Sequence, residues 1–167
     1  MIKICRNCLH LFEGSSTIDY CPIRNCGGWE LVEIDDMLAD VLTRFWSMGI
    51  STVFSCSGHL YDYCFSPHVM FDEPRCDEGR KALTFLRNVL MDLNEETNLV
   101  DIGEIEPLRD MYTFTVRAKK CEDDPILRME VQSDFLSFLY EASEFIRTEL
   151  FGDCDCEHAE ADKKEAV

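Results

Sequence analysis

Four cysteines near the N-terminus have the spacing of metal ligands. Two residues separate Cys5 from Cys8, four separate Cys21 from Cys26, and twelve residues join the two pairs. Two short cysteine turns joined in this way can place four sulfurs around one tetrahedral ion. Thiolates select zinc or iron, and four of them leave no coordination position open. The spacing therefore predicts a closed, structural site with one zinc ion as its cofactor.

Residues 1–33, which carry the two cysteine turns, resemble a zinc ribbon or a rubredoxin-like knuckle. Gly27 and Gly28 follow the second turn, where a positive φ is expected. Leu9 stands after the first turn, where rubredoxin knuckles have glycine, and this difference favours zinc over an iron redox site. The resemblance implies a small module that folds around its metal.

A second group of reactive side chains follows a predicted strand and comprises Ser55, Cys56, Ser57, Gly58 and His59. Its hydroxyls and backbone N–H groups could hold an anion such as a carboxylate or phosphate. Its thiol and imidazole could form a nucleophile–base pair. The same two residues could instead belong to a second metal site formed by Cys56, His59, Cys64, His68 and Cys76. A strand end with a buried cysteine and a polar turn is the simplest alternative.

The string from Ser55 to Gly58, preceded by Thr52, is similar to the Ser-Cys-Ser-Gly motif of the tRNA wybutosine-synthesising methyltransferases of the third type. In that family the motif ends a strand, and the enzymes use S-adenosylmethionine on a tRNA base. The resemblance implies that Ser57 and Gly58 line a cofactor or substrate pocket. His59 stands where the family has arginine, so the resemblance does not imply a phosphate-contacting residue at this position. The string also resembles one in small uncharacterised bacterial and phage proteins, for which no activity is implied.

Charge and composition narrow the choice of partners and compartment. The chain has 167 residues and a formal charge of −17, which repels nucleic acid and anionic membranes. No apolar stretch is long enough to span a membrane, and no signal peptide is recognisable. These features predict a cytoplasmic protein whose partner is a protein or a small molecule rather than nucleic acid. Ten cysteines in a reducing compartment favour metal binding or reactivity over disulfides.

The elements that must position these groups follow from apolar periodicity. The patterns predict, in order, a helix from residue 34 to about 48, strands at 50–55 and 67–71, a helix at 77–94, strands at 99–105 and 111–118, and a helix from 125 that ends before 152. We therefore expect an α+β fold in which a mostly antiparallel sheet packs against three helices. The predicted division is a zinc ribbon at 1–33, the α+β domain at 34–152 and an acidic, disordered tail at 153–167, where Cys154, Cys156 and His158 could bind a further metal.

Three functions are compatible with the sequence. The first is a zinc-binding module that recognises a protein or a small ligand. The second is an enzyme with a pocket at Ser55–His59 that acts on a nucleotide-like or other small anionic substrate, with S-adenosylmethionine as a possible cofactor. The third is an acidic inhibitor that mimics nucleic acid. The sequence does not predict the substrate, the partner or the oligomeric state.

Overall fold

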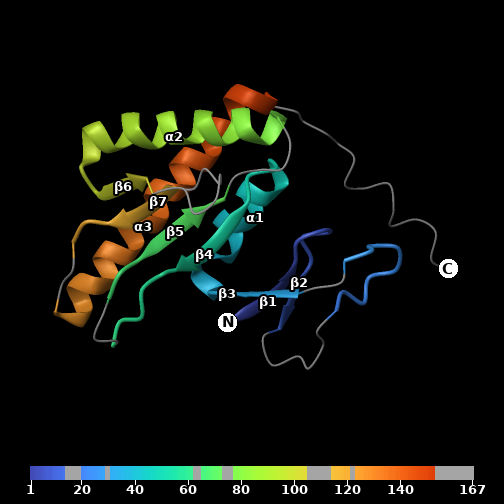
Figure 1. Ribbon diagram of the computed structural model, residues 1–167. Coiled ribbons are helices and arrows are strands. Elements are labelled where there is room, and N and C mark those ends of the chain that lie inside the picture. The colour runs from blue at the N-terminus through green and yellow to red at the C-terminus, as the bar shows by residue number, and fades with distance from the viewer. Residues whose placement is uncertain are drawn as a thin grey trace.

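The protein has the α+β architecture that the sequence predicts (Figure 1). The computed structural model describes residues 1–13, 20–28, 31–61, 65–72, 77–104, 114–120 and 123–152. Within these ranges the order of helix, two strands, helix, two strands and helix after the N-terminal module is confirmed. The tail at 153–167 lies outside the described residues.

The N-terminal module is a small antiparallel sheet of strands β1 (Ile2–Cys5), β2 (Leu11–Glu13) and β3 (Leu31–Ile34), with β1 in the middle. Its strands are too short to enclose a core of their own. Ile4 and Ile34 are buried instead in the same apolar cluster as the first α-helix. The inner side of this small sheet therefore packs on the body of the protein, while the cysteine turns project from its end.

A four-stranded sheet forms the body, in the order β4 (Thr52–Cys56), β5 (His68–Phe71), β7 (Phe114–Ala118) and β6 (Val100–Glu104). All neighbouring strands are antiparallel. Because side chains alternate along a strand, Val69 and Phe71 point to the buried face, and Met70 and His68 point to the other.

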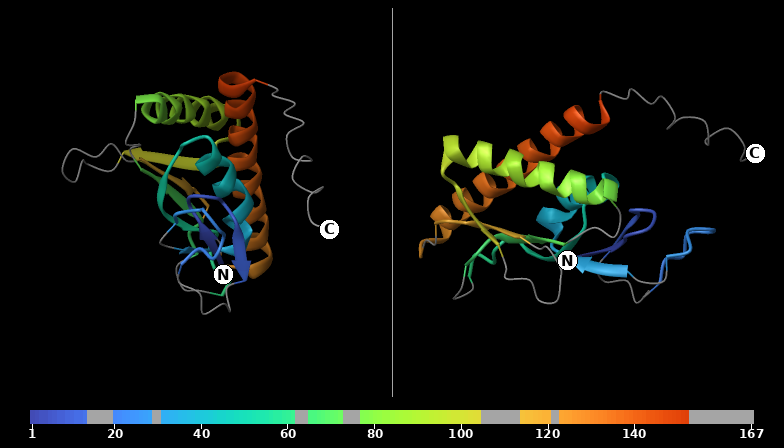
Figure 2. Two further views of the ribbon diagram at one scale, coloured as in Figure 1. Left: turned by 90° about the vertical axis from the view of Figure 1, so that its right-hand side faces the viewer. Right: turned by 45° about the horizontal axis from the view of Figure 1, so that its top comes forward.

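Three helices cover the buried face. Helix α1 (Ala39–Ser47) follows a 3-10 turn at Asp36–Leu38, α2 spans Asp77–Thr97, and α3 spans Pro125–Ile146 before a π-helical turn at Arg147–Phe151. Figure 2 shows α1 and α3 on the same side of the sheet, with α2 against the end of α3. Helix α3 contacts both other helices and β7, so it is the central support of the fold.

Aromatic contacts join the helices to the sheet. The ring of Phe45 on α1 meets Phe71 edge-on at 5.2 Å, and Phe71 stacks on Phe114 at 5.0 Å. Such pairs add about 0.5–1.5 kcal/mol each beyond the area they bury. These contacts fix α1 over β5 and β7, and therefore also fix the turns at the two ends of α1.

The start of the first helix differs from the sequence prediction, and the structure also shows whether the last helix is continuous. Ile34 ends β3 instead of starting the first helix, and Asp35 caps the 3-10 turn by accepting a hydrogen bond from the Met37 N–H. Helix α3 runs without a break through Ser133 and is capped by Asp124. In the described part of the chain, no helix combines the length and the apolar composition needed to cross a membrane.

Candidate metal centre and the Cys56 turn

The four predicted cysteine ligands converge at the end of the N-terminal sheet. Their sulfurs all lie within 4.8 Å of one another, with Cys5 3.5 Å from Cys26 and Cys8 3.6 Å from Cys21. Four sulfurs placed about 2.3 Å from one ion would be roughly 3.8 Å apart. A disulfide would instead need about 2.05 Å, and these cysteines are free. The arrangement can therefore hold a metal ion.

Backbone turns aim the sulfurs inward. In the first turn the Leu9 N–H donates to the Cys5 carbonyl at 2.8 Å, and Leu9 itself adopts a φ of 57°. Leucine thus takes the left-handed conformation for which rubredoxin knuckles use glycine. In the second turn the Cys26 N–H donates to the Ile23 carbonyl at 3.1 Å, and Asn25 has a φ of 66°. The second turn, although longer, is therefore also closed by a backbone hydrogen bond.

The two glycines after Cys26 serve different purposes. Gly27 has the expected positive φ, at 67°. Gly28 does not, so this part of the expectation was wrong. A Cβ at Gly28 would lie 2.5 Å from the Cys5 sulfur and 3.3 Å from the Cys26 sulfur. Gly28 is therefore required because its backbone approaches the sulfurs closely.

The thiols have unequal pKa values. The Asn7 side-chain amide donates to both the carbonyl and the sulfur of Cys26, and it lowers the pKa of that thiol to about 6. Partial burial and the neighbouring thiols raise the pKa of Cys21 to about 12. Four adjacent thiolates repel one another, and a divalent cation between them would relieve that repulsion.

Arg6, between two of the cysteines, attaches the metal centre to the body. Its guanidinium donates to the Thr52 carbonyl at 2.8 Å and lies 5.1 Å from the centroid of the Trp46 ring. The Trp46 indole in turn donates to the Thr52 hydroxyl at 3.0 Å. The first cysteine turn is thereby tied to the start of β4, the strand that leads to Cys56.

At the end of β4, Cys56 and His59 come together with a residue that the sequence analysis missed. The Cys56 sulfur lies 3.9 Å from His59 Nδ1, and the Asp35 carboxylate lies within 4.8 Å of both. The sequence signal at Asp35 is that of a helix cap, and no spacing pattern links it to Cys56. Tertiary packing alone makes this three-residue group, which we call the Asp35 cluster.

The residues between Cys56 and His59 are held from inside the protein. Ser57, only 3% exposed, donates its hydroxyl to Asp35 Oδ2 at 2.5 Å. The buried Gln132 amide donates to the Ser57 carbonyl and to the Gly58 carbonyl, both at 2.9 Å. Gly58 has a φ of 81°, which suits glycine. Ser55 is half-buried in β4 and faces the helices, opposite Val69.

Of the other ligands predicted for this site, only His68 lies in the described part of the chain, and it is not in this cluster. His68 pairs with Cys56 across β4 and β5, but its Nδ1 donates to the Ser66 carbonyl at 2.7 Å. The remaining candidates lie outside the described residues: Cys64, Cys76, Cys154, Cys156 and His158. The structure thus brings together Cys56 and His59 from the predicted second site, with Asp35 as their partner.

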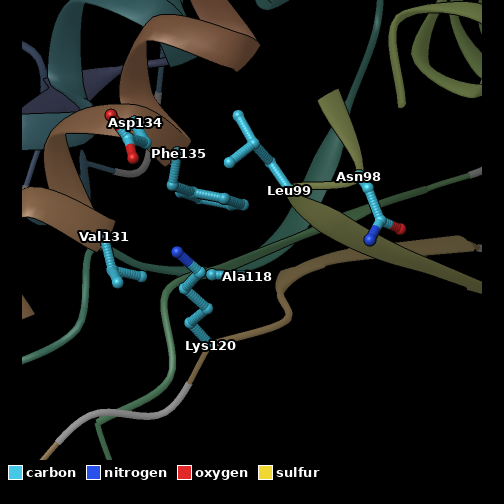
Figure 3. A pocket seen from close by; sticks show the side chains of 7 residues that line it. All are labelled: Asn98, Leu99, Ala118, Lys120, Val131, Asp134 and Phe135. Atoms are coloured by element: carbon cyan, nitrogen blue, oxygen red, sulfur yellow. The ribbon is translucent and has the colours of Figure 1, made fainter. Parts of the chain in front are cut away.

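A small pocket lies elsewhere, between α3 and the ends of β6 and β7 (Figure 3). Its cavity volume is about 20 Å³, room for about one water-sized molecule, and apolar side chains dominate its lining. The lining residues are Asn98, Leu99, Ala118, Lys120, Val131, Asp134 and Phe135.

Comparison of the chain with protein-family models, curated proteins and solved structures found no match. The resemblance to the wybutosine-synthesising methyltransferases therefore rests on the string at Ser55–Gly58 alone.

Proposed function

We propose that this chain is a zinc-binding protein-interaction module that recognises a basic partner through the N-terminal half of α3. Zinc is the proposed ion because four thiolates in a closed tetrahedral set match structural zinc sites. The role of the ion would be to fold a module that has no core of its own. The binding surface would then be on the body of the protein.

Exposed apolar side chains on α3 carry this proposal. Ile126 is 69% exposed, Met129 56% and Leu127 43%. The side of the helix that Ile126 and Met129 face away from buries Val131 and Phe135. Leu127, four residues before Val131, lies at the edge between the two sides. A helix that is apolar on both sides is expected to be covered on both sides. We call Ile126, Leu127 and Met129 the α3 patch.

The charges around the α3 patch indicate what would cover it. Asp123, Asp124, Glu130 and Asp134 are exposed around it. The only basic residue of α3 is Arg128, which is buried and donates to the Leu60 carbonyl at 2.7 Å. An apolar centre with an acidic rim is complementary to a basic, amphipathic segment of another protein.

The pocket beside the patch favours a protein partner over a small ligand. Val131, Asp134 and Phe135 of α3 form one wall, and Leu99 and Ala118 lie opposite (Figure 3). Its cavity volume of about 20 Å³ is far below the usual 300–1,000 Å³ of small-molecule sites.

A defined peptide tests the binding surface. An amphipathic helical peptide of leucine and lysine should bind the full chain, and its affinity should fall steeply with salt. Met129→Ser and Glu130→Lys should each weaken binding about tenfold or more, by loss of apolar contact and of charge complementarity. Fluorescence anisotropy measures the affinity.

Matched variants outside the patch provide the controls. Met91→Ser on α2 and Glu149→Lys beyond α3 change residues of the same types that are also exposed. Met91→Ser should leave the affinity within about twofold of that of the unmodified chain. Glu149→Lys changes the net charge as much as Glu130→Lys does, so any further loss in Glu130→Lys is due to its position in the patch. Equal losses in patch and control variants, or no binding by the unmodified chain, would contradict the proposal.

Metal analysis tests the ion. The purified protein should contain zinc, and replacing Cys8 and Cys21 by serine should remove the ion held by the four cysteines. Iron at this site, with the absorption of an iron–thiolate centre, would overturn the assignment.

A further inference from the structure

We propose that Asp35, Cys56 and His59 form a second metal site, which binds a zinc-like divalent cation and, with these three ligands from the described residues, leaves one coordination position open. The site is separate from the four-cysteine centre and from the α3 patch, so this proposal can be tested independently of the proposed function. It assigns a chemical role to the turn after β4.

The distances allow a shared ion. Zinc binds sulfur at about 2.3 Å and imidazole nitrogen at about 2.0–2.1 Å, so one ion can bridge atoms up to roughly 4.3 Å apart. The Cys56 sulfur and His59 Nδ1 are 3.9 Å apart, which fits an ion between them with a wide angle. One oxygen of the Asp35 carboxylate lies within 4.8 Å of the Cys56 sulfur and of a ring nitrogen of His59, so a side-chain shift of about half an ångström would bring it within reach of the same ion.

The ligand types distinguish this site from the first. One sulfur, one nitrogen and one oxygen form a three-ligand set of the kind found where zinc keeps a fourth position for water or substrate. Four thiolates, by contrast, close the coordination sphere. His59 is exposed, whereas Asp35 and Cys56 are half-buried. The open position would therefore face solvent on the side of His59.

The surroundings hold the ligands in place. Asp35 Oδ2 accepts hydrogen bonds from the hydroxyl and the N–H of Ser57, and Oδ1 accepts one from the Met37 N–H. The Gly58 N–H points to the Cys56 sulfur at 3.4 Å. Outer contacts of this kind orient ligands and raise metal affinity.

Gln132 extends this support to α3. Its amide donates to the Ser57 hydroxyl at 3.1 Å, and that hydroxyl donates in turn to Asp35. This line of hydrogen bonds from Gln132 through Ser57 holds the Asp35 carboxylate in place. The three ligands come from two segments of the chain, and this line connects both segments to the central helix.

Counting metal ions tests the site. The full chain, loaded with excess zinc and passed through a desalting column, should retain two equivalents by native mass spectrometry. Cys56→Ser and His59→Ala should each retain one. Asp35→Asn, which keeps a hydrogen-bond acceptor but is a weaker ligand, should bind the second ion about tenfold or more weakly in competition with a chromophoric chelator.

His68→Ala is the matched control, because it removes a neighbouring histidine that lies outside the cluster, and it should retain two equivalents. His59 is exposed, so its replacement keeps the test valid even if Cys56→Ser unfolds the chain. One equivalent in the unmodified protein, or two in His59→Ala, would overturn the proposal.

Cobalt tests the open position. Cobalt bound at the second site should give a visible spectrum that changes when thiocyanate is added, because an exogenous ligand enters the free position. The spectrum of the four-cysteine centre, measured alone in His59→Ala, should not change. A second-site spectrum that thiocyanate leaves unaltered would overturn the open position.

Discussion

The side-chain amide of Gln132 donates to the hydroxyl of Ser57 at 3.1 Å and to its carbonyl at 2.9 Å. These residues are 75 positions apart in the chain. Both are almost fully buried. The turn that carries Cys56 and His59 is therefore positioned by the central helix, and its geometry depends on a residue whose sequence position shows no link to it.

Replacing Gln132 by alanine should destabilise the protein by about 2–3 kcal/mol, because buried carbonyls of the turn lose their donor. Urea unfolding followed by circular dichroism measures the free energy. Ser133→Ala, the exposed neighbour on the same helix, is the control and should change stability by less than about 0.5 kcal/mol. Equal stabilities of the two variants would show that the amide contributes nothing.

Gly58 and Gly49 form a matched pair that separates backbone strain from crowding. Both have positive φ, at 81° and 76°, but a Cβ at Gly58 would lie 2.7 Å from the Phe65 ring, whereas Gly49 has open space. Gly49→Ala should cost about 1–2 kcal/mol of stability from strain. Gly58→Ala should cost about 3 kcal/mol or more, because overpacking adds to the strain. Thermal unfolding ranks the two, and the reverse order would refute this account.

The parts of the fold that could be predicted are those whose signals are local. Apolar periodicity reveals α3, and the pair Asp124-Pro125 marks its start. Cysteine spacing reveals the four-sulfur group because each turn is only a few residues long. Where both the expected and the observed end lie in described residues, strand ends shifted by at most two residues, since hydrogen bonding and not composition ends a strand.

The rest of the candidate site could not be predicted because it is made by contacts between distant segments. Asp35 reads as a helix cap, and only the packing of the 3-10 turn against β4 brings it to Cys56. Gln132 reads as one polar residue on an apolar helix. The sequence suggests that Gly28 is needed for a turn, whereas the structure requires glycine there because its backbone lies close to the sulfur of Cys5, which belongs to the other cysteine turn.

Asn7 should set the pH dependence of metal binding at the four cysteines. Its amide lowers the pKa of Cys26 to about 6, so protons compete weakly with the metal for this sulfur. Asn7→Ala should raise that pKa, and half-maximal zinc binding should move to higher pH. A chelator competition measured from pH 5 to 8 detects the shift. Asn94→Ala, which removes an amide that accepts from the Val100 N–H, is the control and should leave the midpoint unchanged.

Gly28 and Gly27 should affect metal affinity differently, although they are adjacent. A methyl group at Gly28 meets the Cys5 sulfur at 2.5 Å, so Gly28→Ala must displace a ligand. We expect its zinc affinity to fall roughly 10- to 100-fold, the range seen when the support of a ligand is lost. Gly27→Ala contacts nothing within 4 Å, and its strain at a φ of 67° should reduce stability more than affinity. Chelator competition and thermal unfolding on both variants separate the two effects. Unchanged affinity in Gly28→Ala would mean that the sulfurs are not held at this distance, and that the close approach of the backbone is incidental to metal binding.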